Sequence, residues 1–226
     1  MIGTLVNFAT VAAGSFLGAV LKNRIPSRLS GTVIQGIGLF TLYLGVSMSL
    51  SAKNGILVLF SILIGGLIGE ALDIEGALDS LGRRLEKRFG SGNGDFTRGF
   101  VTASLLFCVG PMTIVGSIQD GLVGDYQILL TKGIMDGFCS VALASTLGIG
   151  VGFSALVVLI YQGALTLFAS WARGFLTDPV VSLMTATGGL MIIGIGINLL
   201  EIKKLRVGNL LPALAVAVVL GLVAVK

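Results

Sequence analysis

The chain has 226 residues, of which 54% are hydrophobic and only 12% are charged, and its mean hydropathy is +1.01. A soluble domain carries about 25% charged residues, so this chain would lack the polar surface needed to cover a core in water. Its net charge of +4 comes from basic residues in short segments between apolar runs, a distribution typical of loops beside a membrane and not of a nucleic-acid partner. Because lipid offers the backbone no hydrogen-bond partners, we expect an all-α integral membrane protein.

Apolar runs long enough to cross a bilayer, at about 20 residues each, predict eight transmembrane helices in a single domain, residues 1–226. The first run has no basic segment before it, so we interpret it as a retained helix and not as a signal peptide. The stretch 127–172 is too long for one crossing and divides at Gly148–Gly152. The predicted spans are residues 3–21, 31–50, 55–72, 98–118, 127–148, 152–172, 180–200 and 208–225.

The lysines and arginines predict the orientation of these spans. Threading eight spans alternately across the bilayer leaves four basic residues on one side, namely Lys53, Lys132, Arg173 and Lys226. The other eleven lie on the opposite side: Lys22, Arg24, Arg28, Arg83, Arg84, Lys87, Arg88, Arg98, Lys203, Lys204 and Arg206. The side with more lysine and arginine faces the cytoplasm, so both termini are predicted outside the cytoplasm.

The longest polar connection, residues 73–97, is cytoplasmic in this topology. Within it, apolar residues recur at helical spacing between Ile74 and Phe89, and Arg83, Arg84, Lys87 and Arg88 fall mostly on other faces. This pattern is typical of an amphipathic helix that lies on the membrane surface with its basic side near anionic headgroups. A connector helix that is exposed to solvent or packed against protein is the alternative.

A weak internal repeat links the two halves of the chain. The segment Gly38–Ser47 aligns with Gly189–Asn198, and Asn54 aligns with Asn209. The second and third spans therefore resemble the seventh and eighth, but with opposite orientation. Many secondary transporters are built from such inverted-topology repeats, with the solute site near mid-membrane. A chance alignment of two glycine-rich hydrophobic helices is the alternative.

Charged residues within a span are costly, by about 2.5–3.5 kcal/mol at a helix centre on insertion scales, so Asp136 requires a physical reason. Lys132 lies one helical turn earlier and is close enough to form an ion pair with it. Asp136 could bind a cation, carry a proton or face a water-filled cavity. An Asp–Lys pair that only satisfies itself near the outer surface is the alternative.

Pro111 interrupts the predicted fourth span. Proline has no amide hydrogen and clashes with the preceding turn, so the helix should kink or break there, and a break exposes backbone groups that could bind an ion or a polar solute. Gln119 and Asp120 follow towards the outer end of the span. A proline kink packed by its neighbours is the alternative. Asn198 is a weaker candidate, as are three other amides, Asn7, Gln35 and Gln162, for which hydrogen bonds between helices are the simpler role.

Catalytic machinery of the soluble type is missing from the sequence. The chain has no histidine, no phosphate-binding G-x-x-x-x-G-K-[ST] loop, and no serine or cysteine with a recognisable base. Cys108 and Cys139 lie in apolar runs and cannot form a Cys/His zinc site. We therefore expect no enzyme, no metal and no cofactor.

The central part of the chain resembles a known family. The motifs are Gly110-Pro111-Met112, Gly116 to Gly121, Gly124-Asp125-Tyr126, Leu130-Thr131-Lys132, Asp136-Gly137, Ala144 to Val151 and Tyr161-Gln162-Gly163. In these segments the chain is similar to the YdfK/YqgA-type family of bacterial membrane proteins, and the likeness extends over the whole chain. The resemblance implies a multi-pass protein of the bacterial inner membrane and supplies no substrate.

Two functions follow as expectations. The first is a transporter or channel for a small solute or ion, with a site around the Pro111 break, Gln119, Asp120 and Asp136. The second is a non-transporting scaffold or sensor that acts through the basic segment 74–89. The expected partners are the lipid bilayer and a small solute or ion, and the glycine-rich helix faces permit a homodimer without requiring one.

Overall fold

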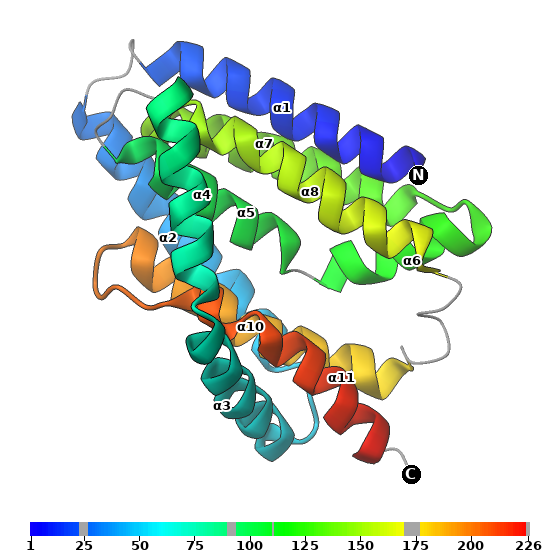
Figure 1. Ribbon diagram of the computed structural model, residues 1–226. Coiled ribbons are helices and arrows are strands. Elements are labelled where there is room, and N and C mark those ends of the chain that lie inside the picture. Colours follow the sequence, from blue (N-terminus) through cyan, green and yellow to red (C-terminus); the bar gives the residue numbers. More distant parts are fainter. Residues whose placement is uncertain (23–26, 90–93, 110, 170–176, 225–226) are drawn as a thin grey trace.

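The computed structural model describes residues 1–22, 27–89, 94–109, 111–169 and 177–224, and these residues form helices without any strand. The helices are α1 (Ile2–Lys22), α2 (Ser27–Ser49), α3 (Gly55–Leu72), α4 (Ile74–Phe89), α5 (Asp95–Cys108), α6 (Pro111–Val123), α7 (Gln127–Leu147), α8 (Gly150–Leu167), α10 (Asp178–Leu199), the 3₁₀ helix η1 (Val207–Leu210) and α11 (Pro212–Ala224). Figure 1 shows their order along the chain. The predicted all-α class is confirmed.

Six of these helices are long and apolar enough to cross a membrane, or seven if the bent pair α5–α6 counts as one span. The sequence predicted eight. The predicted fourth span is divided into α5 and α6, which meet at 71°. The predicted eighth span becomes the shorter apolar segment Val207–Val223, because its first residues form η1 and its α-helix starts only at Pro212.

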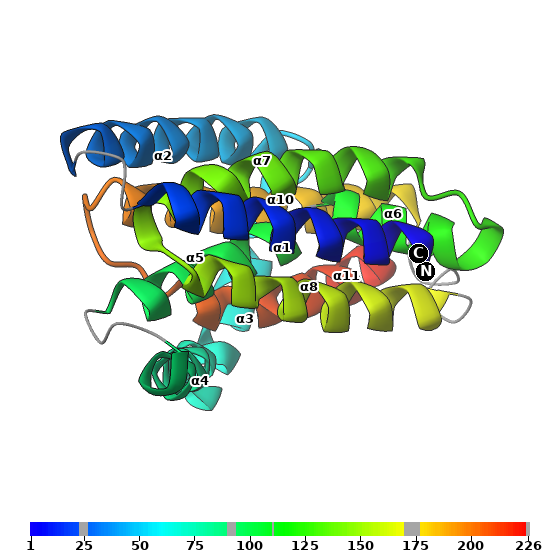
Figure 2. The same cartoon turned by 90° about the horizontal axis from the view of Figure 1, so that it is seen from above.

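Most of the helices run along one common axis, and the two chain termini lie at the same end of the bundle (Figure 2). The opposite end is held together by ion pairs between elements distant in sequence. Lys22 Nζ lies 2.9 Å from Asp95, and Arg98 lies 2.7 Å from Glu201. Arg206 contacts Glu70 and Asp73. We call this the basic end; Arg24, Arg173 and Lys226 lie outside the described residues.

Glycines allow α1 and α7 to pack side by side with their backbones in close contact. A Cβ atom on Gly14 would overlap the carbonyl oxygen of Gly137, and a Cβ atom on Gly18 would overlap that of Val141. The glycines are four residues apart on α1, which places them on one face of the helix. This small-residue packing is common between membrane helices, and it fixes the separation of the two helices that carry the site described below.

A second close contact joins α2 and α10, which run antiparallel. A Cβ atom on Gly45 would lie 2.8 Å from the carbonyl oxygen of Gly189, and one on Gly189 would lie 2.7 Å from that of Gly45. Seven residues away on each helix, a Cβ atom on Gly196 would lie 3.1 Å from the carbonyl oxygen of Gly38. The glycines that align in the sequence repeat are therefore those that meet at this interface.

We predict that Gly14→Ala destabilises the protein, because the added methyl group overlaps a backbone carbonyl that side-chain rotation cannot move. Overpacking of this kind costs about 1–3 kcal/mol. Thermal unfolding of the purified protein in detergent should show a lowered Tm. The control is Gly36→Ala in α2, where a Cβ atom meets nothing within 4 Å. Equal unfolding temperatures for the two variants would contradict the tight packing of α1 on α7.

Candidate functional site

The break between α5 and α6 follows from the chemistry of proline. In a continuous helix the carbonyl of Phe107 would accept a hydrogen bond from residue 111, but Pro111 has no amide hydrogen. The Thr113 hydroxyl instead donates to the Phe107 carbonyl at 3.1 Å. On the other side, a Cβ atom on Gly188 of α10 would lie 3.0 Å from the Val109 carbonyl oxygen. The broken backbone is thus partly satisfied by a side chain and packed closely against α10.

A buried polar network lies between α1, α7 and α8. Lys132 and Asp136 form an ion pair one turn apart on α7, with 7% and 13% of their side chains exposed. Asp136 is the tenth of the 21 residues of α7, so it lies at the middle of that helix. From α1, the Asn7 amide nitrogen donates to Asp136 at 3.1 Å and to the side-chain oxygen of Gln162 in α8 at 2.9 Å. This buried network joins three helices, and its α1 member, Asn7, is the sixth of the 21 residues of that helix.

This network has unused hydrogen-bonding capacity. Asn7 and Gln162 are both fully buried, yet the side-chain oxygen of Asn7 and the side-chain nitrogen of Gln162 have no partner among the described residues. The hydroxyls of Ser15, Ser104 and Ser117 are buried and unpartnered in the same way. Because buried polar groups nearly always find a partner, these atoms mark places where water or a polar solute would be bound.

Asp120 of α6 contacts the same face of α1 as Asp136 does, but nearer the end of the bundle where the two chain termini lie. Its carboxylate accepts a hydrogen bond from the Gly3 amide at 3.1 Å and lies 2.9 Å from the Met1 amine. A carboxylate at the start of a helix is favoured by the helix dipole. Between Asp120 and the buried network, Thr4 and Thr166 share a hydrogen bond of 3.3 Å. The polar groups therefore continue along α1 from Asp120 to Asp136.

The other predicted site residues have separate positions. Gln119 is half-buried on α6 next to Asp120. The backbone of Pro111 begins α6, and its side chain lies outside the description. The amide of Asn198 is engaged by one residue, since it donates to the Leu205 carbonyl at 2.8 Å and accepts from the Leu205 amide at 2.7 Å. Asn198 therefore holds the loop after α10 and does not meet Asp136.

Helix α4 lies across the bundle axis at the basic end (Figures 1 and 2). Two buried or half-buried carboxylates fix it. Glu86 accepts hydrogen bonds from the Gly94 amide at 2.8 Å and the Thr97 hydroxyl at 2.6 Å, which joins α4 to the start of α5. Glu75 accepts from the Gly208 amide at 2.9 Å. Burial raises the pKa of Glu75, although this amide and the charges of Lys204 and Arg206 oppose the shift.

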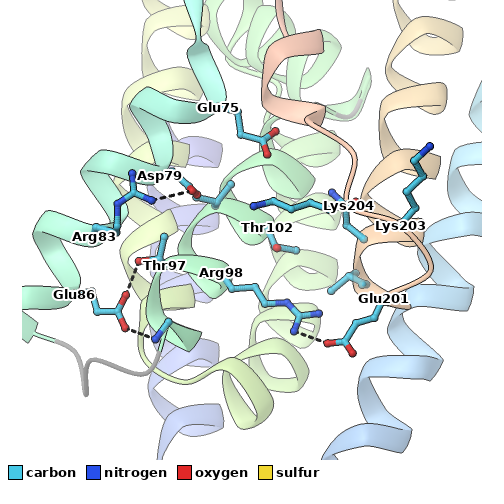
Figure 3. A pocket seen from close by; sticks show the side chains of 14 residues that line it. Glu75, Asp79, Arg83, Glu86, Thr97, Arg98, Thr102, Glu201, Lys203 and Lys204 are labelled. Atoms are coloured by element: carbon cyan, nitrogen blue, oxygen red, sulfur yellow. Dashed lines mark hydrogen bonds and ion pairs between the residues drawn. The ribbon is translucent and has the colours of Figure 1, made fainter. Parts of the chain in front are cut away.

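The four basic residues predicted for the membrane surface divide between two faces of α4. Arg83 forms an ion pair with Asp79 at 3.1 Å and lines a cavity of about 690 Å³ between α4, α5 and the loop after α10 (Figure 3). Arg84, Lys87 and Arg88 are exposed and do not line this cavity. The charges that sequence reasoning grouped together therefore have different surroundings.

Sequence reasoning treated Asn7 and Gln162 as ordinary links between helices and did not connect them to Asp136. The signal was present, because each is an amide in a long apolar run, but spacing along one chain does not show which helices meet. Most of the cavity residues were missed for the same reason, and Arg83 and Asn198, which also line the cavity, were predicted to act elsewhere. Among the described residues there is no group of three or more metal-binding side chains.

The buried pair predicts an unusual response to mutation. Lys132→Met leaves the Asp136 charge without its ion-pair partner, and Asp136→Leu does the same to Lys132; removing one partner of a buried pair typically costs 3–5 kcal/mol. We predict that the double variant Lys132→Met/Asp136→Leu unfolds at a higher temperature than either single variant. Thermal unfolding in detergent tests this. If the double variant lost as much stability as the two single variants together, the two residues would not be coupled.

Comparison with known proteins gives the same family over the full chain. A family model described as "Protein of unknown function (DUF554)" matches residues 2–222. The chain is 34% identical over 220 residues to the "Uncharacterized membrane protein YdfK" of Bacillus subtilis (strain 168), covering 96% of this chain and 93% of that protein. It is 29% identical over 226 residues to the "Uncharacterized protein YqgA" of Escherichia coli (strain K12), covering 98% of this chain and 96% of that protein. No solved structure matches. This multi-pass membrane protein therefore belongs to the DUF554 family.

Proposed function

We propose that this protein is a transporter or channel for a small solute or ion in the bacterial inner membrane. The observation that carries the proposal is the buried network of Asp136, Lys132, Asn7 and Gln162, which keeps charged and unpartnered polar atoms inside a helical membrane protein. Ionisable groups within membrane spans are expensive, and they usually mark a solute or proton pathway. A purely structural helix bundle would be more stable with apolar residues at these positions.

The broken span supports the same function. The α5–α6 break lies within the bundle, and the unpartnered hydroxyls of Ser104 and Ser117 lie on its two arms. Discontinuous helices are a recurring device in transporters because they present free backbone groups at membrane depth. The charged cavity at the basic end is lined by Arg98 and Thr102 of α5, the same helix that leads to the break. A route from that cavity past the break would bring a solute towards the network.

The glycine contacts between α2 and α10 support an inverted-topology repeat. The alignment pairs Gly38 with Gly189 and Gly45 with Gly196. Under this alignment, Gly189 corresponds to Gly38 and Gly45 corresponds to Gly196. The contact of Gly38 with Gly196 therefore corresponds to the contact of Gly189 with Gly45, and both contacts are present. This is the relationship that a pseudo-twofold axis between the repeats requires. By the positive-inside rule, we place the basic end in the cytoplasm and both termini outside it.

We predict that Asp136→Asn abolishes solute entry while the protein remains folded. Asparagine keeps an oxygen that can accept from Lys132 and Asn7 but removes the charge. Purified protein in liposomes can be mixed with concentrated ions, amino acids, small organic acids or neutral polyols, and re-swelling after osmotic shrinkage can be followed by light scattering. The wild type should admit at least one class of solute, and the variant should slow its entry by at least about tenfold, which corresponds to about 1.4 kcal/mol in the barrier.

The control is Asp125→Asn, the same chemical change in an exposed connection, which should leave entry unchanged. Wild-type entry in the Asp136→Asn variant would remove Asp136 from the mechanism. Failure of the wild type to admit any solute would overturn the transport function itself.

A second function, contact of α4 with anionic lipid, is favoured by one surface. Arg84, Lys87 and Arg88 are exposed together with Leu81 at 45% and Phe89 at 52%. A basic cluster beside exposed apolar side chains is typical of helices that bind anionic headgroups. This arrangement would suit a scaffold or sensor that works from the membrane surface.

We predict that phosphatidylglycerol raises the Tm of the wild-type protein relative to phosphatidylcholine, and that replacing Arg84, Lys87 and Arg88 with glutamine removes most of this difference. Surface-bound basic residues contribute about 1 kcal/mol each on anionic membranes. Arg83→Gln, on the cavity side of the same helix, is the matched control and should keep the difference. A triple variant that responds to phosphatidylglycerol like the wild type would eliminate this surface as a lipid contact.

A further inference from the structure

The cavity at the basic end has walls of opposite charge. Its α4 wall carries three acidic residues and one basic residue, Glu75, Asp79, Glu86 and Arg83, which gives a net charge of −2. The wall formed by the start of α5 and the end of α10 with its following loop carries Arg98, Glu201, Lys203 and Lys204, with a net charge of +2. Figure 3 shows Asp79, Arg83 and Glu86 on one side of the cavity and Glu201, Lys203 and Lys204 on the other.

On the acidic wall, Glu86 uses both carboxylate oxygens, for the Gly94 amide and the Thr97 hydroxyl, whereas Glu75 and Asp79 each use one. Glu75 accepts from Gly208 through Oε2, and Asp79 contacts Arg83 through Oδ2. The side chain of Arg83 is 58% exposed, so its pairing with Asp79 is a surface contact of small energetic worth. Asp79 therefore retains acceptor capacity towards the cavity.

The basic wall carries cations without partners. Within the described part of the chain, neither Lys203 nor Lys204 forms an ion pair or a side-chain hydrogen bond. Lys204 points from the loop towards α4, into the cavity, whereas Lys203 points away (Figure 3). Arg98 is bound to Glu201, whose side chain is 71% exposed. Lys204 is thus the free cation that faces the acidic wall.

We propose that this cavity binds a small zwitterionic molecule, with its ammonium group at Asp79 on the α4 wall and its acid anion at Lys204 on the opposite wall. The volume of about 690 Å³ falls within the range of small-molecule sites, roughly 300–1,000 Å³. A ligand with one charge would satisfy one wall and be repelled by the other. A zwitterion is neutral overall, as is the sum of the eight charged residues in the lining.

This inference deepens the proposed function, because the cavity would then collect the transported solute at the basic end. Only this collecting role of the cavity rests on the proposed function. The binding itself needs no transport. The same pair of charges occurs on soluble amino acids and on the headgroup of phosphatidylethanolamine, so both sources belong in the test.

The experiment measures binding to the purified full chain in detergent by isothermal titration calorimetry and by the shift in Tm, since a ligand of the folded state raises its stability by mass action. The probes are glycine, 4-aminobutyrate and 6-aminohexanoate, whose increasing charge separation samples the span of the cavity. Butylamine and butyrate carry only one charge each, and phosphatidylethanolamine in mixed micelles represents the lipid source. At least one zwitterion should bind roughly tenfold or more tightly than both single-charge analogues, since each charge-assisted hydrogen bond is worth this much or more.

Lys204→Gln and Asp79→Asn should each weaken that binding by roughly tenfold or more. Lys53→Gln and Asp125→Asn make the same chemical changes elsewhere and should leave it intact. The inference would be overturned if butylamine or butyrate bound as tightly as every zwitterion. It would also be overturned if no zwitterion bound at all. Asp136→Asn separates the two hypotheses, because retained zwitterion binding without solute entry in this variant supports both. Solute entry by a wild-type protein that binds no zwitterion overturns the inference alone.

Discussion

The close contact of α1 with α7 positions the polar groups on which the proposed function depends. Glycine at positions 14 and 18 lets two backbones approach so closely that a Cβ atom at either position would overlap a carbonyl oxygen of α7. At this separation the short side chain of Asn7 reaches Asp136 directly. A wider spacing would leave the Asp136 and Lys132 charges with only one another, at a depth where lipid supplies no hydrogen bonds.

The polar groups of this protein form two regions with different electrostatic character. In the buried network, a single ion pair and two amides are enclosed by three helices, with some donor and acceptor capacity left over. At the basic end, opposite charges face each other across a cavity whose walls come from segments distant in sequence. The first region suits passage of a polar group through an apolar environment, and the second suits its capture from water. Helix α5 contributes to the cavity and ends at the break, so it connects the two regions.

Helix α4 shows how one amphipathic segment can serve two environments. Its carboxylates face the protein, where Glu86 satisfies the amide at the start of α5 and Glu75 holds η1. Its remaining basic residues face outwards beside Leu81 and Phe89. The helical period of 3.6 residues makes this division possible within 16 residues, and it explains why Arg83 and Arg84, adjacent in sequence, have different surroundings.

The sequence by itself determined the membrane class, the segments that become helices, the glycine packing faces, the Lys132–Asp136 pair and the interruption at Pro111. These follow from local chemistry: hydropathy over about 20 residues, spacing of one helical turn, and the missing amide hydrogen of proline. Only the tertiary structure decided that Asn7 and Gln162 join Asp136, that Asn198 holds a loop, and that Lys204 and Asp79 line the same cavity. Each of these depends on which helix faces meet, and apolar helix surfaces in lipid are too much alike for one sequence to specify their neighbours.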